Sequence, residues 1–170
     1  MCRRRSRSRS NCSRRGRVKI AVAADQAEKL VVALKQSGIK ETGGQLFGEQ
    51  LAPSNFRVTE LTVQSRPGTF ARFVVDLLQA AKDAVRFFDR TEHRYTRYNY
   101  IGEWHSHPSF AVQPSGTDVA AMRGIVSDPR FAGSFAVLMI VRLDVETLTT
   151  GAWVFDPQGA ELRVTLEMES

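Results

Sequence analysis

Two of the three histidines in this chain lie one residue apart, in the segment EWHSHPSFAVQPSGTD at residues 103–118. Successive side chains of a strand point to opposite faces, so residues two apart share a face. If a strand ends here, His105 and His107 present two imidazoles to one point, and Ser106 faces away. Pro108 lacks a backbone donor and ends the strand, and the loop that follows can return the chain to the histidines.

Ser115 and Asp118 take the N-cap and N3 positions of a helix that we expect from Ser115 to about Ser127. Taken alone, the pair indicates a capping box, in which hydroxyl and carboxylate each satisfy a backbone donor. Together with His105 and His107, Asp118 also completes a set of three Zn²⁺ ligands. The fourth tetrahedral position then stays open for water, which is typical of catalytic zinc. Such a site further needs a general base and a donor to the oxyanion that forms after attack.

The segment begins with H-S-H-P, has seven residues between the second His and a Ser, and has two more before an Asp. This order resembles the JAMM motif of the JAB/MPN (Mov34/PAD-1) metalloprotease family. The matching residues are His105, Ser106, His107, Pro108, Ser115 and Asp118. Upstream, ETGGQLFG at residues 41–48 is similar to the family segment E-x-x-G-x-L-x-G, which carries the general base. The resemblance covers roughly residues 18–155. Locally, GEWHSHP, PSGTD and ETGG are similar to a bacterial branch whose genes accompany E1-like and E2-like enzymes of ubiquitin-like conjugation, several of them linked to antiphage defence.

This resemblance implies roles for particular residues. One zinc ion per chain would be held by His105, His107 and Asp118. Glu41 would accept the proton of the zinc water and pass it to the leaving amine, and Ser115 would hydrogen-bond the tetrahedral intermediate or the metal water. Glu49 and Glu103 are rival acids. Glu103 shares the face of His105 further back along the strand, and Glu49 falls outside the matched register.

The resemblance also implies a substrate and partners. Family members usually cut an amide after the C-terminal tail of a ubiquitin-like protein, so we expect an isopeptidase or precursor-processing peptidase with that protein and its conjugates as substrate. E1-like and E2-like enzymes of the same pathway are candidate partners. An extended tail can join an exposed sheet edge. The segment SRPGTFARF at residues 65–73 is the expected flap near that edge, although Phe70 and Phe73 fit the core equally well.

Three alternatives stay open. A zinc-free MPN scaffold would bind ubiquitin-like partners without cutting, but such relatives usually lack a ligand and this sequence lacks none. A nucleic-acid-binding protein would act through its basic tail. A phosphoesterase usually needs two metals and more carboxylates than this cluster offers.

The rest of the sequence predicts the elements that must hold these residues. The predicted strands cover residues 17–24, 45–50, 56–64, 99–104, 134–143, 148–155 and 161–168, and the predicted helices cover residues 25–36, 76–91 and 115–127. Asp25 is the expected N-cap of the first helix, Trp104 and Trp153 are expected in the core, and His93 at the surface. Grouped rather than alternating elements predict an α+β fold. The resemblance makes this a JAB/MPN, cytidine-deaminase-like sandwich, with a curved mixed sheet flanked by about three helices.

Composition limits what else the chain can be. At 170 residues, 42% of them hydrophobic, it can bury one ordinary core, so we expect one domain from residue 18 to 170. The net charge of +6 arises near the N-terminus, where nine Lys and Arg between Arg3 and Lys19 have no acid among them. The other 15 basic residues face 18 acidic ones, so the rest of the chain is mildly acidic.

Residues 1–17 are an Arg/Ser low-complexity segment with almost nothing apolar to bury, so we expect a disordered tail. Its basic side chains suit an arm for nucleic acid, and a solvated extension is the alternative. Cys2 and Cys12 both lie in this tail, which leaves the domain without a disulfide or a thiolate metal site. The sequence predicts neither a secretory signal nor a membrane span, and so a cytoplasmic location.

Overall fold

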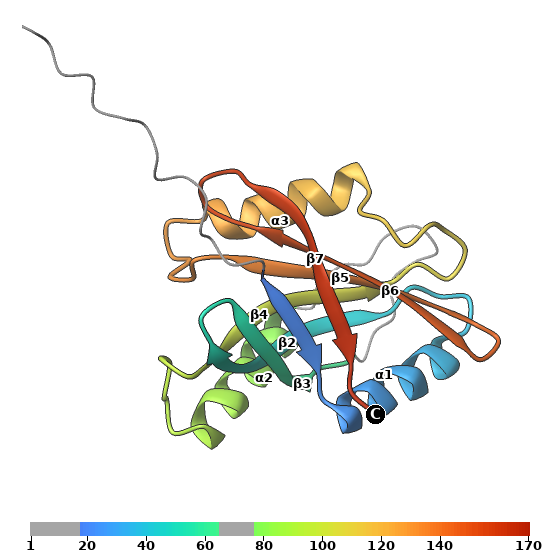
Figure 1. Cartoon of the computed structure of the whole chain (residues 1–170), viewed down its shortest axis with the longest axis horizontal. Coiled ribbons are helices and arrows are strands. Elements are labelled where there is room, and N and C mark those ends of the chain that lie inside the picture. Colours follow the sequence, from blue (N-terminus) through green and yellow to red (C-terminus); the bar gives the residue numbers. More distant parts are fainter. Residues whose placement is uncertain (1–17, 65–76) are drawn as a thin grey trace, which may run out of the picture.

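Figure 1 shows the computed structural model of the chain, which describes residues 18–64 and 77–170. Within these ranges, seven strands close into a barrel in the order β1-β3-β2-β4-β5-β6-β7. The strands are β1 (Lys19–Val22), β2 (Gly43–Ala52), β3 (Asn55–Leu61), β4 (Tyr98–Ser106), β5 (Ala136–Asp144), β6 (Thr147–Phe155) and β7 (Glu161–Met168). The helices are α1 (Ala24–Ser37), α2 (Leu77–Arg90) and α3 (Gly116–Ser127). The Arg/Ser tail, the expected flap and residue 76, the expected start of the second helix, lie outside the described residues.

The α+β class and the mixed sheet are confirmed, but the expected curved-sheet sandwich needs correction because the sheet closes into a barrel. The short strand β1 lies between β3 and β7, parallel to both, with Ile20 opposite Phe56 on one side and Leu166 on the other. Figure 1 shows β1, in blue, beside β7, in red. As a result, each of the described strands has a neighbour on both sides over at least part of its length, since β1 pairs with Thr165–Met168 of β7. The exposed edge that we expect for a substrate strand stays a prediction.

The first helix has its N-cap two residues earlier than predicted. Ala23 is its N-cap, without a side-chain capping bond, and Asp25 lies in the first turn. Ala23 is held instead by the sheet, since its N–H donates to the carbonyl of Val58. The helix ends at Gly38, whose φ of 59° suits a residue without Cβ.

One face of every strand contributes to a single apolar cluster, to which α1 adds Leu30 and Leu34. Trp104 is fully buried in it and donates its indole N–H to the carbonyl of Thr62 at 2.8 Å. The other face of β5 and β6 packs against α3 in a second cluster that contains Trp153. Both tryptophans therefore lie in the core, as predicted.

The end of β4 that carries the two histidines lies between β2 and β5. His105 is opposite Gly43 of antiparallel β2 and Ile140 of parallel β5. Because β2 runs the other way, the residues just before Gly43 lie beside the last residues of β4. The barrel thus brings residues 41–42 next to residues 105–107, although more than sixty positions separate them.

Among the described helices, none is both long and apolar enough to cross a membrane.

The third histidine, His93, is exposed, as predicted, and lies against Asp89 and Tyr95 near the end of α2.

Candidate metal centre

The two histidines at the end of β4 point to the same place. Their Nε2 atoms lie 3.0 Å apart, and both residues are buried, with exposures of 6% for His105 and 7% for His107. Ser106 faces away, as the strand alternation predicted, and its Oγ accepts a hydrogen bond from the N–H of Thr42. Pro108 follows outside the strand.

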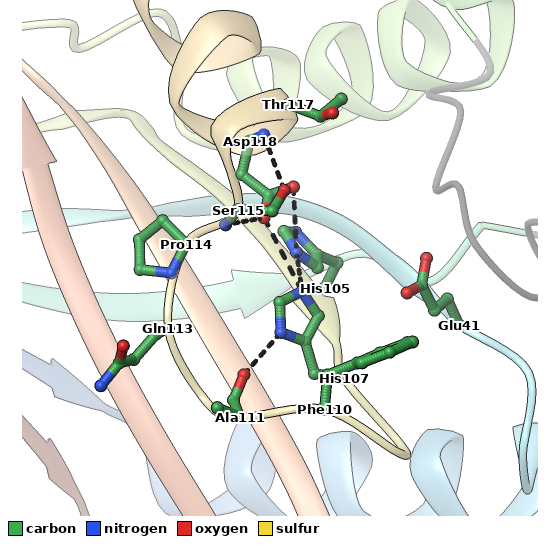
Figure 2. Close-up of a pocket in the computed structure, with 10 residues that line it drawn as sticks. All are labelled: Glu41, His105, His107, Phe110, Ala111, Gln113, Pro114, Ser115, Thr117 and Asp118. Carbon is green, nitrogen blue, oxygen red and sulfur yellow. Dashed lines mark hydrogen bonds and ion pairs between the residues drawn. The ribbon is translucent and has the colours of Figure 1, made fainter.

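Asp118 approaches the same two nitrogens from the first turn of α3 (Figure 2). Its Oδ1 lies 3.4 Å from Nε2 of His105, and its Oδ2 lies 3.7 Å from Nε2 of His107. The carboxylate also accepts the backbone N–H of Ser115 at 2.7 Å, while Ser115 Oγ accepts the N–H of Asp118 at 3.2 Å. The capping box is therefore present, and it aims the carboxylate at the histidines rather than competing with that contact.

These three residues form a group that could hold a metal ion. Ligands bound to tetrahedral Zn²⁺ at 2.0–2.2 Å lie about 3.3–3.6 Å from one another. The two Nε2 atoms are 3.0 Å apart, and the nearest carboxylate oxygens of Asp118 lie 3.4 Å (Oδ1 to His105) and 3.7 Å (Oδ2 to His107) from them, which is close to that range. Two nitrogens and one oxygen also match the donor set of catalytic zinc sites. The residues present therefore fit the ion that the sequence predicted.

A hydrogen bond on the far side of its ring sets the tautomer of His107. Its Nδ1 lies 2.8 Å from the carbonyl of Ala111. A carbonyl can only accept, so Nδ1 carries the proton, and Nε2 of the neutral ring presents a lone pair toward His105 and Asp118. Such support is typical of histidines that bind metals.

The carboxylate of Asp118 is held in its ionised form. Burial by itself raises its pKa, but hydrogen bonds from His105 and Ser115 outweigh burial and hold the pKa of Asp118 well below its usual range. A carboxylate beside two imidazole nitrogens is a donor set that suits a divalent cation at this point.

Glu41 lies in the same pocket. It is 7% exposed, and Figure 2 shows it to one side of the histidines, apart from Asp118. The pocket has a volume of about 470 Å³. The two histidines, Asp118, Ser115 and Glu41 all line this one pocket.

The two rival acids lie elsewhere. Glu49 is near the far end of β4, opposite Tyr98, where it forms an ion pair with Arg97 at 3.0 Å. Glu103 is not among the pocket residues. Burial raises the pKa of Glu103 to about 6, while His105 and a hydrogen bond from Tyr100 act in the opposite direction.

The loop between β4 and α3 contributes pocket residues that the sequence analysis missed. They are Phe110, Ala111, Gln113, Pro114 and the helix residue Thr117. Phe110 is 52% exposed, and its ring is 6.3 Å from that of His107, edge to face. Arg142 holds this loop by donating to the Phe110 carbonyl at 3.0 Å. The fixed length of the loop between Pro108 and Ser115 was the signal that could have indicated these residues.

The chain belongs to the family described as prokaryotic homologs of the JAB domain, whose members match residues 23–155. That range includes every element from α1 to β6 and all five candidate site residues. The bacterial JAB/MPN placement drawn from the motif is thereby confirmed.

Two known proteins extend the comparison. A protein of Enterobacter hormaechei subsp. hoffmannii (strain UCI 50), named CD-NTase/cGAS isopeptidase, is 26% identical over 123 residues. The match covers 72% of this chain and 66% of that protein, slightly under two thirds of its length. The solution structure of protein DSY2949 from Desulfitobacterium hafniense superposes with a TM-score of 0.65 and 16% identity, over 89% of this chain and 93% of that one. At that identity the likeness concerns the fold alone.

Proposed function

We propose that this chain is a zinc-dependent isopeptidase or peptidase that cuts the amide bond after the C-terminal tail of a ubiquitin-like protein. The observation that carries this proposal is the meeting of His105, His107 and Asp118 with a buried glutamate, Glu41, in one pocket. The name of the Enterobacter relative supports an isopeptide as the bond that is cut. We further propose that residues 18–170 form the JAB/MPN domain.

The zinc ion would be held by His105, His107 and Asp118. When bound, it supplies a Lewis acid and lowers the pKa of a coordinated water toward about 7. Glu41 accepts the proton of the attacking water and returns it to the nitrogen that leaves. A carboxylate suits both steps because it can hold a proton between them.

Ser115 stabilises the negative charge that develops on the carbonyl oxygen. Its Oγ already accepts the Asp118 N–H, and a hydroxyl can accept and donate at the same time. For a bond to the oxyanion, the hydroxyl proton would turn away from the Asp118 carboxylate, which the Ser115 side chain also reaches. The backbone N–H of Ser115 is not available for this purpose, since it donates to Asp118.

The substrate that we propose is a ubiquitin-like protein, either extended at its C-terminus or joined to a lysine. The surrounding pathway is a bacterial ubiquitin-like conjugation system with E1-like and E2-like enzymes, of the kind linked to antiphage defence. The motif resemblance supports this pathway, and the isopeptidase name of the relative agrees with it.

The test uses the ubiquitin-like protein of the neighbouring genes, made with a C-terminal extension and incubated with this protein with and without a chelator. Glu41→Gln should keep zinc bound and lower turnover by about 10²–10⁴-fold, and His107→Ala should lose both zinc and turnover. Glu49→Gln is the matched control, because it is the same substitution near the far end of β4 from the histidines. It should cleave at the parent rate. A Glu41→Gln variant as fast as the parent would show that the base is assigned wrongly.

A further inference from the structure

Ser106, which lies between the two histidines, points away from them and makes two hydrogen bonds to the backbone of Thr42. Its N–H donates to the carbonyl of Thr42 at 2.8 Å, and its Oγ accepts the N–H of Thr42 at 3.0 Å. Both residues are almost completely buried, at 1% and 2% exposure. One residue therefore holds both backbone polar groups of Thr42.

This pair of bonds lies beyond the regular strand pairing. The last paired positions of β2 and β4 are Gly43 and His105. Glu41 and Thr42 precede β2, so the ladder alone does not fix them. The Thr42 N–H belongs to the peptide group that joins Glu41 to Thr42, and a bond to this N–H fixes the plane of that group. The hydrogen bond from this N–H to Ser106 thus links the backbone of Glu41 to the residue that lies between His105 and His107.

We infer that Ser106 is a positioning residue for Glu41, setting the distance and direction from which this carboxylate approaches the space between His105, His107 and Asp118. The inference rests on the proposed role of Glu41 as the general base. Reacting groups must be held close to their productive geometry, and a displacement of about 1 Å can lower a rate by roughly 10²-fold. Any residue except proline at position 106 supplies the N–H bond. The second bond needs a side-chain oxygen on Cβ, which serine and threonine provide and alanine does not.

The chain offers a matched control at Gln45, three residues after Thr42. Thr62 Oγ1 accepts the N–H of Gln45 at 2.9 Å, so a hydroxyl also holds this backbone donor of β2. Gln45 lies further into β2, where the pairing with β4 already fixes the backbone. Removing the Thr62 hydroxyl should therefore cost stability without moving Glu41.

The experiment compares full-length parent, Ser106→Ala, Ser106→Thr, Thr62→Ala and Glu41→Gln. Besides Tm, three quantities are measured: amide hydrogen exchange at Thr42 and Gln45, zinc affinity by competition with a chromogenic chelator, and kcat and KM on the extended ubiquitin-like protein. In Ser106→Ala, the Thr42 amide should exchange faster, and zinc affinity should stay within roughly threefold of the parent because all three ligands remain. Its kcat should fall by roughly 10–100-fold, with little change in KM. Ser106→Thr should restore all three values. Thr62→Ala should exchange the Gln45 amide faster, lower Tm about as much as Ser106→Ala does, and keep the parent kcat.

The outcomes separate this inference from the proposed function. If Glu41→Gln is inactive while Ser106→Ala keeps the parent kcat, Glu41 stands as the base and the positioning role of Ser106 is overturned. If Ser106→Ala and Thr62→Ala lose kcat equally, Ser106 acts through stability alone, which also overturns it. If Glu41→Gln keeps full activity, the proposed base fails, and the role of Ser106 fails with it.

Discussion

Ser115 combines two roles whose sizes can be separated. As an N-cap, its Oγ accepts the Asp118 N–H, and loss of this bond in Ser115→Ala should lower the free energy of unfolding by about 1 kcal/mol. The reciprocal bond from the Ser115 backbone to Asp118 survives the substitution, so the metal ligand stays oriented. As a donor to the oxyanion, the same hydroxyl should be worth about 10²–10³-fold in kcat, or about 2.7–4 kcal/mol. The catalytic loss should therefore exceed the loss of stability.

Ser115→Gly separates the two effects. Glycine at an N-cap costs only a few tenths of a kcal/mol relative to serine, whereas alanine costs about 1 kcal/mol. The two variants should thus differ in stability and lose kcat to the same extent, because both lack the hydroxyl. Ser115→Thr keeps both functions and should resemble the parent.

The assay pairs urea unfolding with kcat on the extended ubiquitin-like protein, for each Ser115 variant at saturating zinc. Equal kcat losses in the Ala and Gly variants, with unequal stabilities, are the expected result. Parent-like turnover in Ser115→Gly, or a loss of turnover that follows the loss of stability, would show that capping is the whole role of Ser115.

Two further predictions concern stability. Burial raises the pKa of Glu103 from 4.5 to about 6, so this carboxyl group binds a proton more tightly in the folded state than in the unfolded state. Its contribution to stability is therefore complete below pH 4.5 and is lost as the pH rises through 6. Urea unfolding of the chelator-treated proteins measures this effect. Between pH 4.5 and 7, the free energy of unfolding of the parent should fall by about 2 kcal/mol more than that of Glu103→Gln, and equal pH dependence in the two proteins would contradict this. Gly44→Ala would place a Cβ 2.1 Å from the Thr62 carbonyl oxygen, a backbone atom that cannot turn aside, and should destabilise by about 1–3 kcal/mol or prevent folding. In α3, a Cβ at Gly124 would meet no atom within 4 Å, so Gly124→Ala should instead stabilise the protein by about 1 kcal/mol. Thermal melts in which Tm changes in the same direction for both variants would refute the steric argument.

The sequence predicted most elements but not how the sheet closes. Periodicity indicates which face of a strand is buried, and for β4 it placed Trp104 in the core and His105 on the opposite face. It carries no information on which strands pair across the whole chain. The pairing of Lys19 with Thr165 joins residues near the two ends of the described domain and closes the barrel. No local pattern predicts such a contact.

The candidate site was predictable to the extent that chemistry and spacing define it. The structure brings His105, His107 and Asp118 together and places Glu41 in the same pocket, and their catalytic roles stay predictions. The contribution of Phe110 was missed because a loop residue has no periodicity to indicate where its side chain points. The interpretations of residues 1–17 and 65–73 concern segments outside the described ranges, and they also stay predictions.

The metal requirement is the central claim, and it has a direct measurement. Chelator-treated protein is titrated with zinc while bound metal and cleavage of the extended ubiquitin-like protein are followed together. The account predicts no cleavage without metal, and activity that rises with added zinc and levels off at one equivalent per chain. Metal-free protein that cleaves at the parent rate, or zinc that binds equally well to His107→Ala, would contradict it.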